Sequence, residues 1–175
     1  ICILQPNFLI MANTANRITP GGFLKMLSFL HLGIAATPIA LGIFFYVQSQ
    51  NAELSLEDEG DMFMAIVPLI AVSSIFIGDF LFKKWIGSLP EKMALRDKLA
   101  KFQSAAIIKY ALMEGAALFA MVIFSNTQNL TYLLIGVFMI FYLILQRPTK
   151  DKIERILNLR GEEKAQFDQL NEPLD

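Results

Sequence analysis

Four long apolar stretches dominate the pattern along this chain and predict four membrane-spanning helices. They cover about residues 23–47, 62–82, 105–124 and 130–145. A helix of about 20 apolar residues crosses a bilayer core of about 30 Å, and the 16 residues of the last stretch need slight bilayer thinning. The strands of a membrane barrel would alternate apolar and polar residues, whereas these stretches are apolar at odd-numbered and even-numbered positions alike. The sequence therefore predicts an all-α fold, an integral membrane four-helix bundle with a cytoplasmic helical extension.

The segments that flank the four stretches divide the chain into three parts. We take residues 1–22 as an N-terminal flank, residues 23–147 as the membrane domain, and residues 148–175 as an amphipathic helix with a polar tail. The first ten residues, ICILQPNFLI, are too short to span a bilayer and lack the basic start of a signal peptide. Because Met11 offers a natural start, residues 1–10 are left out of the predicted fold.

The third span is predicted to begin in a helix that projects from the membrane. Pro90 suits the first turn of such a helix, because proline has no N–H to lose there. The apolar positions that follow share one helix face. They are Leu95, Leu99, Phe102 and Ala106.

The C-terminal segment after the fourth span is predicted to form one short helix and then a polar tail. Thr149 can cap this helix, in which Ile153, Ile156 and Leu157 face one way and charged residues the other. That pattern is typical of a helix lying on the inner leaflet or docked on a partner. The last fifteen residues, GEEKAQFDQLNEPLD, are polar, and we expect them to be disordered.

Composition favours a membrane protein and removes several classes of function. Hydrophobic residues make up 55% and charged residues 18% of the chain, below the roughly 25% charge of soluble domains. The net charge of -1 offers no basic field for nucleic acid. With Cys2 the only cysteine and His31 the only histidine, neither an intrachain disulfide nor a site with several imidazoles can form. We expect no metal, no cofactor and no enzymatic activity.

The distribution of Lys and Arg predicts the orientation. Six lie in residues 83–101, six in the C-terminal tail and two in the N-terminal flank, while residues 48–61 and 125–129 hold none. Lys and Arg are retained in cytoplasmic loops. Both termini should therefore be cytoplasmic, in a multi-pass protein of the plasma (inner) membrane. The acidic residues expected outside are Glu53, Glu57, Asp58, Glu59 and Asp61.

Ionisable side chains within the spans are the candidate functional residues, because each costs at least about 2.5 kcal/mol to insert. Counting 1.5 Å per residue from the inner edge of each span places Asp79 at about 4.5 Å and Lys109 at about 6 Å. Tyr142 enters at the same level. This lower layer is either an ion-pair gate or a snorkelling Lys109 beside a solvated Asp79.

The same arithmetic predicts an upper layer near the middle of the membrane. It places His31 at about 12 Å and Glu114 at about 13.5 Å, level with Ser73 and Ser74. Burial disfavours a charged carboxyl, which makes Glu114 a candidate proton carrier. The structural alternative is a protonated Glu114 that donates a hydrogen bond to His31 or a serine and locks the bundle. Lys109 should face a different neighbour, because five residues turn a helix by about 140°.

The residues around Glu114, in the string ALMEGAALFA, resemble the ion-binding helix of rotor-ring subunits of rotary ATPases. In that family a mid-membrane carboxylate followed by small residues binds a proton or a sodium ion, and the resemblance implies this role for Glu114. The family's partner helix is Gly-rich with a polar hairpin, which the first two spans here do not show. The whole chain also resembles small four-span bacterial membrane proteins without an assigned activity.

These observations favour a non-enzymatic accessory or assembly subunit of a membrane complex, in which buried polar groups specify packing. The alternative is a proton- or ion-coupled carrier or channel element that uses Glu114 with His31. The expected partners are the lipid bilayer and either further copies of the chain or a larger membrane complex, and not nucleic acid.

Overall fold

The computed structural model describes residues 18–56 and 61–174, and every named element in them is a helix. The all-helical prediction is therefore confirmed for this part of the chain. Several expectations fall on residues outside it, namely the start at Met11, Cys2 and Arg17, and the acidic residues at 57–59. The helices are α2 (Pro20–Gln48), α3 (Phe63–Gly87), α4 (Leu95–Thr127), α5 (Leu130–Leu145), α6 (Lys150–Leu157) and α7 (Gly161–Asp168).

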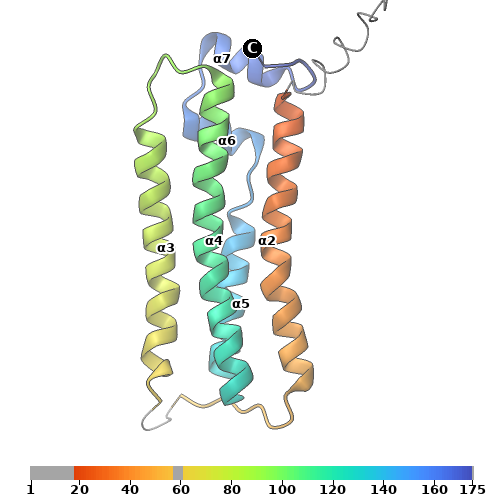
Figure 1. The fold of residues 1–175 in the computed structure, drawn as a ribbon, viewed down its shortest axis with the longest axis vertical. Coiled ribbons are helices and arrows are strands. Elements are labelled where there is room, and N and C mark those ends of the chain that lie inside the picture. Colours follow the sequence, from red (N-terminus) through yellow and green to blue (C-terminus); the bar gives the residue numbers. More distant parts are fainter. Residues whose placement is uncertain (1–17, 57–60, 175) are drawn as a thin grey trace, which may run out of the picture.

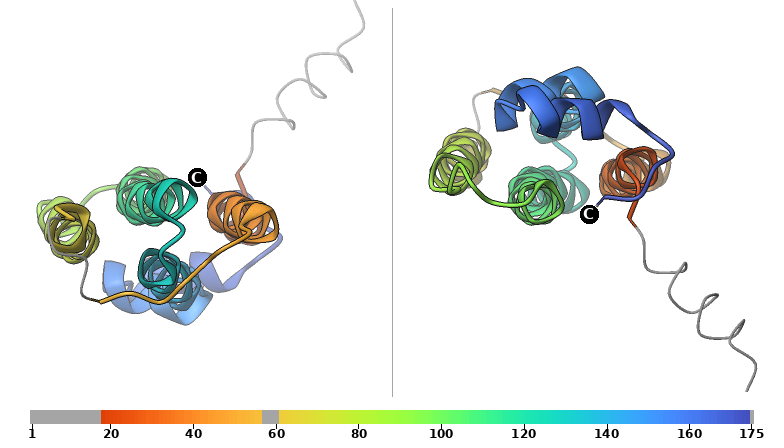
Figure 2. Two further views of the ribbon diagram at one scale, coloured as in Figure 1. Left: turned by 90° about the horizontal axis from the view of Figure 1, so that it is seen from below. Right: turned by 90° about the horizontal axis from the view of Figure 1, so that it is seen from above.

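The four longest helices run side by side, with α4 and α5 between α2 and α3 (Figures 1 and 2). Helix α4 packs against α2, α3 and α5, and α5 also contacts α2 and α3. The start of α2, the α3–α4 connection and the helices α6 and α7 gather at one end, which we call the basic end (Figure 1). The α2–α3 loop and the α4–α5 turn form the opposite end, the loop end.

Three helices of the described residues are long and apolar enough to cross a membrane. They are α2, α3 and α4, with 29, 25 and 33 residues. Helix α5 has 16 residues and is followed, after a bend of 77°, by α6, so a fourth crossing exists only if the bent pair counts as one span. The outward side chains of the long helices are apolar, with Phe29 77%, Val47 76% and Phe76 71% exposed. Such continuous apolar surface is typical of a membrane or subunit interface.

Local chemistry explains where the helices begin. Thr19 caps α2 by accepting a 3.0 Å hydrogen bond from the Gly22 amide, and Pro20 occupies the first turn. The predicted helix start at Pro90 is wrong, because the Pro90 carbonyl closes a turn with the Met93 amide at 3.2 Å. Helix α4 begins only at Leu95, after an extended Ala94.

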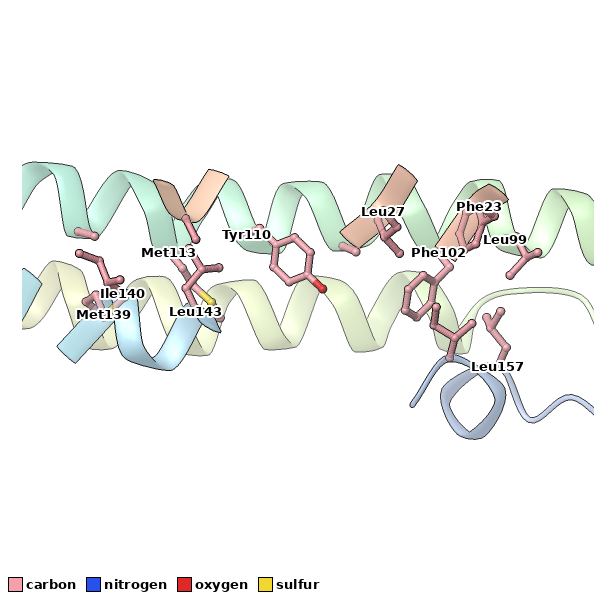
Figure 3. Close-up of a cluster of buried hydrophobic side chains, with 14 of the residues drawn as sticks. Phe23, Leu27, Leu99, Phe102, Tyr110, Met113, Met139, Ile140, Leu143 and Leu157 are labelled. Atoms are coloured by element: carbon pink, nitrogen blue, oxygen red, sulfur yellow. The ribbon is translucent and has the colours of Figure 1, made fainter. Parts of the chain in front are cut away.

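The predicted apolar face of α4 is confirmed. Leu95, Leu99, Phe102 and Ala106 are each at most 3% exposed. Side chains of α4 meet those of α2 and α5 in one apolar core, in which Tyr110 is the exception that carries a hydroxyl (Figure 3). This packing fixes the orientation of α4, and so decides which of its polar residues face α3 and which face α2.

The C-terminal segment departs from the prediction. Helix α6 forms as expected behind Thr149, but Ile153 and Leu157 are buried in the chain's own core, so this apolar face needs no leaflet or partner to cover it. The tail predicted to be disordered contains α7, whose Phe167 is fully buried. The tail also binds the start of α2, because the Gly21 amide donates to the Leu170 carbonyl at 2.9 Å. A few apolar residues in a polar segment are enough to dock it.

At the loop end, Asn129 fastens the α2–α3 loop to the α4–α5 turn. Asn129 is buried, with only 4% of the residue exposed. Its side-chain amide donates to the Ser55 carbonyl at 2.9 Å and accepts from the Ser55 amide at 3.2 Å. Thr131 donates to the same carbonyl at 2.8 Å. The Tyr132 hydroxyl donates to the Asp61 carboxylate. The loop thus holds the ends of all four long helices together.

Candidate functional site

A continuous series of polar side chains connects the four long helices near the basic end. We call it the polar belt, and it consists of His31 on α2, Asp79 on α3, Lys109 and Tyr110 on α4, and Gln146 just after α5. Each member is in contact with another member or with the end of α5, as the distances below show. The belt is the densest connection of polar groups between the long helices in the described part of the chain.

The ion pair between Asp79 and Lys109 is present in the structure. The Lys109 Nζ lies 2.5 Å from the Asp79 carboxylate, with side-chain exposures of 11% for Lys109 and 32% for Asp79. Lys109 also donates to the Gln146 Oε1 at 3.2 Å and lies 5.3 Å from the centre of the Phe82 ring. Helix α3 approaches α4 closely here, because a Cβ added at Gly78 would make ordinary van der Waals contact with Lys109 at 3.4 Å. Lys109 is therefore held by contacts with α3 and with the residue that follows α5.

The belt satisfies the C-terminal end of α5. The last carbonyls of a helix lack partners within the helix, and the end carries a partial negative charge. The His31 Nε2 donates to the Leu143 carbonyl at 2.9 Å, and the Tyr110 hydroxyl donates to the Gln146 carbonyl at 3.1 Å. On the outer side the Lys152 Nζ donates to the Leu145 carbonyl at 3.4 Å. Short α5 therefore ends among side chains that replace water.

His31 belongs to this lower level and not to the predicted upper layer. The His31 ring makes an edge contact with the Tyr110 ring, with the centroids 4.8 Å apart. The depth arithmetic is wrong for His31 because it takes the inner edges of the spans to be level. In the structure α2 begins at Pro20 and reaches α7 beyond the end of α5, so His31 lies beside Leu143.

Glu114 lies apart from the belt. It is half-buried on α4 and its carboxyl lies close to the side chain of Thr37 on α2, whose hydroxyl donates to the Gly33 carbonyl at 3.4 Å. The hydrogen bonds of the described residues do not join it to His31, Ser73 or Ser74. Lys109 pairs with α3 while Glu114 contacts α2, so the predicted difference in direction is confirmed.

The remaining predicted residues take different positions. Tyr142 lies near Asp79 and Gln146, and so beside the belt. Ser74 is buried and donates to the Ala71 carbonyl of its own helix at 2.8 Å, and Ser73 is half-buried. Both serines are on α3, which lies on the far side of α4 and α5 from α2 (Figure 2). They therefore cannot complete a cluster with Glu114 and His31.

Two belt members were missed in the sequence, Tyr110 and Gln146. Gln146 follows the fourth stretch directly and Tyr110 follows Lys109, so both were close to predicted positions. The signal that could have found them is the short fourth stretch, because a helix that ends early must have its carbonyls satisfied by side chains. Within the described residues no group of three His, Cys, Asp or Glu side chains is placed to hold a metal ion.

Fold and site together describe an all-helical protein with three to four helices apolar enough to cross a membrane. No family model matches the chain, and no curated protein or solved structure is significantly similar to it. The likeness to rotor-ring subunits rests on the single segment around Glu114.

Proposed function

We propose that the chain is an integral membrane protein whose four long helices form a bundle, with α6 and α7 in the cytoplasm. Fourteen of the fifteen Lys and Arg residues are described, and thirteen of these lie toward the basic end, Lys109 being the exception. The loop end carries acidic residues such as Glu53 and Asp61. The positive-inside rule then supports both termini in the cytoplasm. The membrane we propose is the plasma (inner) membrane.

The proposed role is that of a non-enzymatic accessory or assembly subunit. The polar belt supports this role, because its polar groups bond to one another and to the end of α5 instead of facing a substrate. Such interhelical hydrogen bonds specify how membrane helices pack. The proposed partners are further copies of the chain or a larger membrane complex.

The observation that carries the assembly role is the position of Glu114, which is half-buried beside exposed residues of α2 and α4. Its contact Thr37 is exposed, and a carboxyl facing lipid would cost about 2.5 to 3.5 kcal/mol or more. A neighbouring helix would remove that cost by excluding lipid and adding hydrogen bonds.

The residues around this contact fit a neighbouring helix. They form what we call the small-residue face, made of exposed Gly33, Thr37, Ala40, Ala111 and Gly115 around Glu114. Gly33 and Ala40 lie one turn before and after Thr37, and Ala111 lies one turn before Glu114. A Cβ added at Gly33 or Gly115 would meet no atom within 4 Å, so the chain's own packing does not need these glycines. Small residues let another membrane helix approach closely.

Enlarging this face should separate the protein from its partner. We expect Gly33→Leu and Ala111→Leu to reduce the particle mass in mild detergent to that of the 19.7 kDa monomer plus detergent, without lowering its unfolding temperature. Light scattering coupled to size-exclusion chromatography measures the mass. Ala65→Leu is the matched control, because Ala65 is an exposed small residue on α3. A wild-type particle that is already monomeric, or a loss of mass equal in the control, would refute the assembly role.

The alternative function, a proton- or ion-coupled element, is favoured by the separation of Glu114 from every ion pair of the described residues. Glu114→Gln distinguishes the two. Glutamine keeps the shape and the position beside Thr37 but cannot carry a proton. An assembly role predicts a normal complex with normal physiology, whereas proton handling predicts a normal complex that is inactive.

A further inference from the structure

The groove between α2 and α5 at the basic end has the shape and chemistry of a lipid site. It contains a cavity of about 400 Å³ with two kinds of lining. Lys25 and Arg147 are cationic, whereas Phe29, Leu32 and Ile144 are apolar. Below them the same two helices line a second, apolar cavity of about 360 Å³, so the groove continues toward the loop end.

The two cations are available for an anionic ligand. Both are exposed, and neither takes part in an ion pair of the described residues. The other nearby cation, Lys152, already donates to the end of α5. His31 lines the groove but uses its Nε2 on the Leu143 carbonyl. Lys25 and Arg147 therefore place two positive charges, free of ion pairs among the described residues, at the basic end of a groove whose other lining is mostly apolar.

The length of the groove matches one leaflet. Lys25 and Ala35, which mark the ends of the upper cavity on α2, are ten residues apart and so about 15 Å along the helix. Half of a bilayer core of about 30 Å is the same distance. A free phosphate would contact the two cations but none of the apolar residues that line the groove.

From this charge and shape we propose that the groove binds one anionic phospholipid of the inner leaflet. Its phosphate contacts Lys25 and Arg147, and an acyl chain lies along Leu32, Ala35 and Ile144. Basic pockets between membrane helices on the cytoplasmic side are suited to such headgroups. The site rests on the proposed membrane orientation, but it does not involve the small-residue face.

The test uses the full chain in phosphatidylcholine nanodiscs that contain a minor fraction of phosphatidylglycerol, with retained lipid counted by native mass spectrometry. We expect one phosphatidylglycerol per chain. The variant Lys25→Gln with Arg147→Gln should bind it about thirtyfold more weakly, since each cation contributes about fivefold near an anionic surface. Lys83→Gln with Lys84→Gln, which removes two exposed cations at the end of α3, is the matched control and should retain the lipid.

A second variant tests the apolar half of the site. Ser28 lines the cavity, and Ser28→Trp should displace the lipid while leaving both cations in place. Equal retention in wild type and both variants, or equally tight binding of inorganic phosphate, would overturn the proposal. So would a fall in particle mass with Ser28→Trp, because the groove would then hold a protein. Failure to enter nanodiscs at all would instead refute the proposal that the helices span a membrane.

Discussion

Replacing Lys109 by methionine should destabilise the helices by about 3 kcal/mol, at the lower end of the range for breaking a buried ion pair because Asp79 is partly exposed. The change leaves the Asp79 carboxylate close to the negative end of α5 without its cation. Asp79→Asn should cost less, about 1 to 2 kcal/mol, because Lys109 keeps its contacts with Gln146 and Phe82. Denaturant unfolding in mild detergent measures these free energies.

The double variant decides whether the two residues act as a pair. Asp79→Asn with Lys109→Met should cost less than the sum of the single changes, because no unpaired charge remains. Lys84→Met is the control, since Lys84 is exposed at the end of α3 and its one described contact is with the Phe80 ring at 6.0 Å. Additivity within about 0.5 kcal/mol would show that the pair contributes no coupling to the belt.

Replacing Phe167 by alanine should release α7 from the basic end. Phe167 is fully buried, and truncating a buried phenylalanine costs about 3 to 5 kcal/mol. The ion pairs of α7 cannot compensate, because the Lys150–Asp168 and Lys164–Glu154 pairs are largely exposed and solvent screens such pairs. The opening should therefore be local to the C-terminal segment.

Limited trypsin digestion of inside-out vesicles measures this release at Arg160 and Lys164. Cleavage should accelerate about a hundredfold, the equivalent of about 3 kcal/mol. The Lys150–Asp168 pair should stay intact at pH 7 and so not affect the cleavage rate, because the hydrogen bond from Lys150 lowers the pKa of Asp168. The stability from that pair is complete above the ordinary carboxyl pKa and is lost only as pH falls through the lowered value. Gln166→Ala, at an exposed neighbour, should cleave like wild type, and unchanged cleavage of Phe167→Ala would contradict the docking of α7.

Some of this structure could be predicted because it depends on features local to one helix. The apolar length of each stretch predicts the helices, and the periodicity of Leu95, Leu99 and Phe102 predicts the buried face of α4. The Asp79–Lys109 pair could be predicted because both lie toward the basic end on antiparallel neighbours.

The rest depends on how far each helix extends past its neighbours, which a single sequence does not reveal. His31 lies beside Leu143 because α2 overshoots α5, and no periodicity within α2 encodes that offset. The partner of Glu114 depends on α2 and α3 lying on opposite sides of α4. The docking of α7 was hidden by its polar composition, in which Phe167 is the single large apolar side chain.

The central claim is that the long helices span a membrane with α6 and α7 in the cytoplasm, and single-cysteine labelling tests it most directly. With Cys2 replaced by serine, Gln50→Cys and Ser88→Cys place exposed thiols at the loop end and the basic end. In intact cells an impermeant maleimide should label position 50 at once, and position 88 only after the membrane is opened. Labelling of position 88 in intact cells, or equal labelling at both positions, would contradict the account.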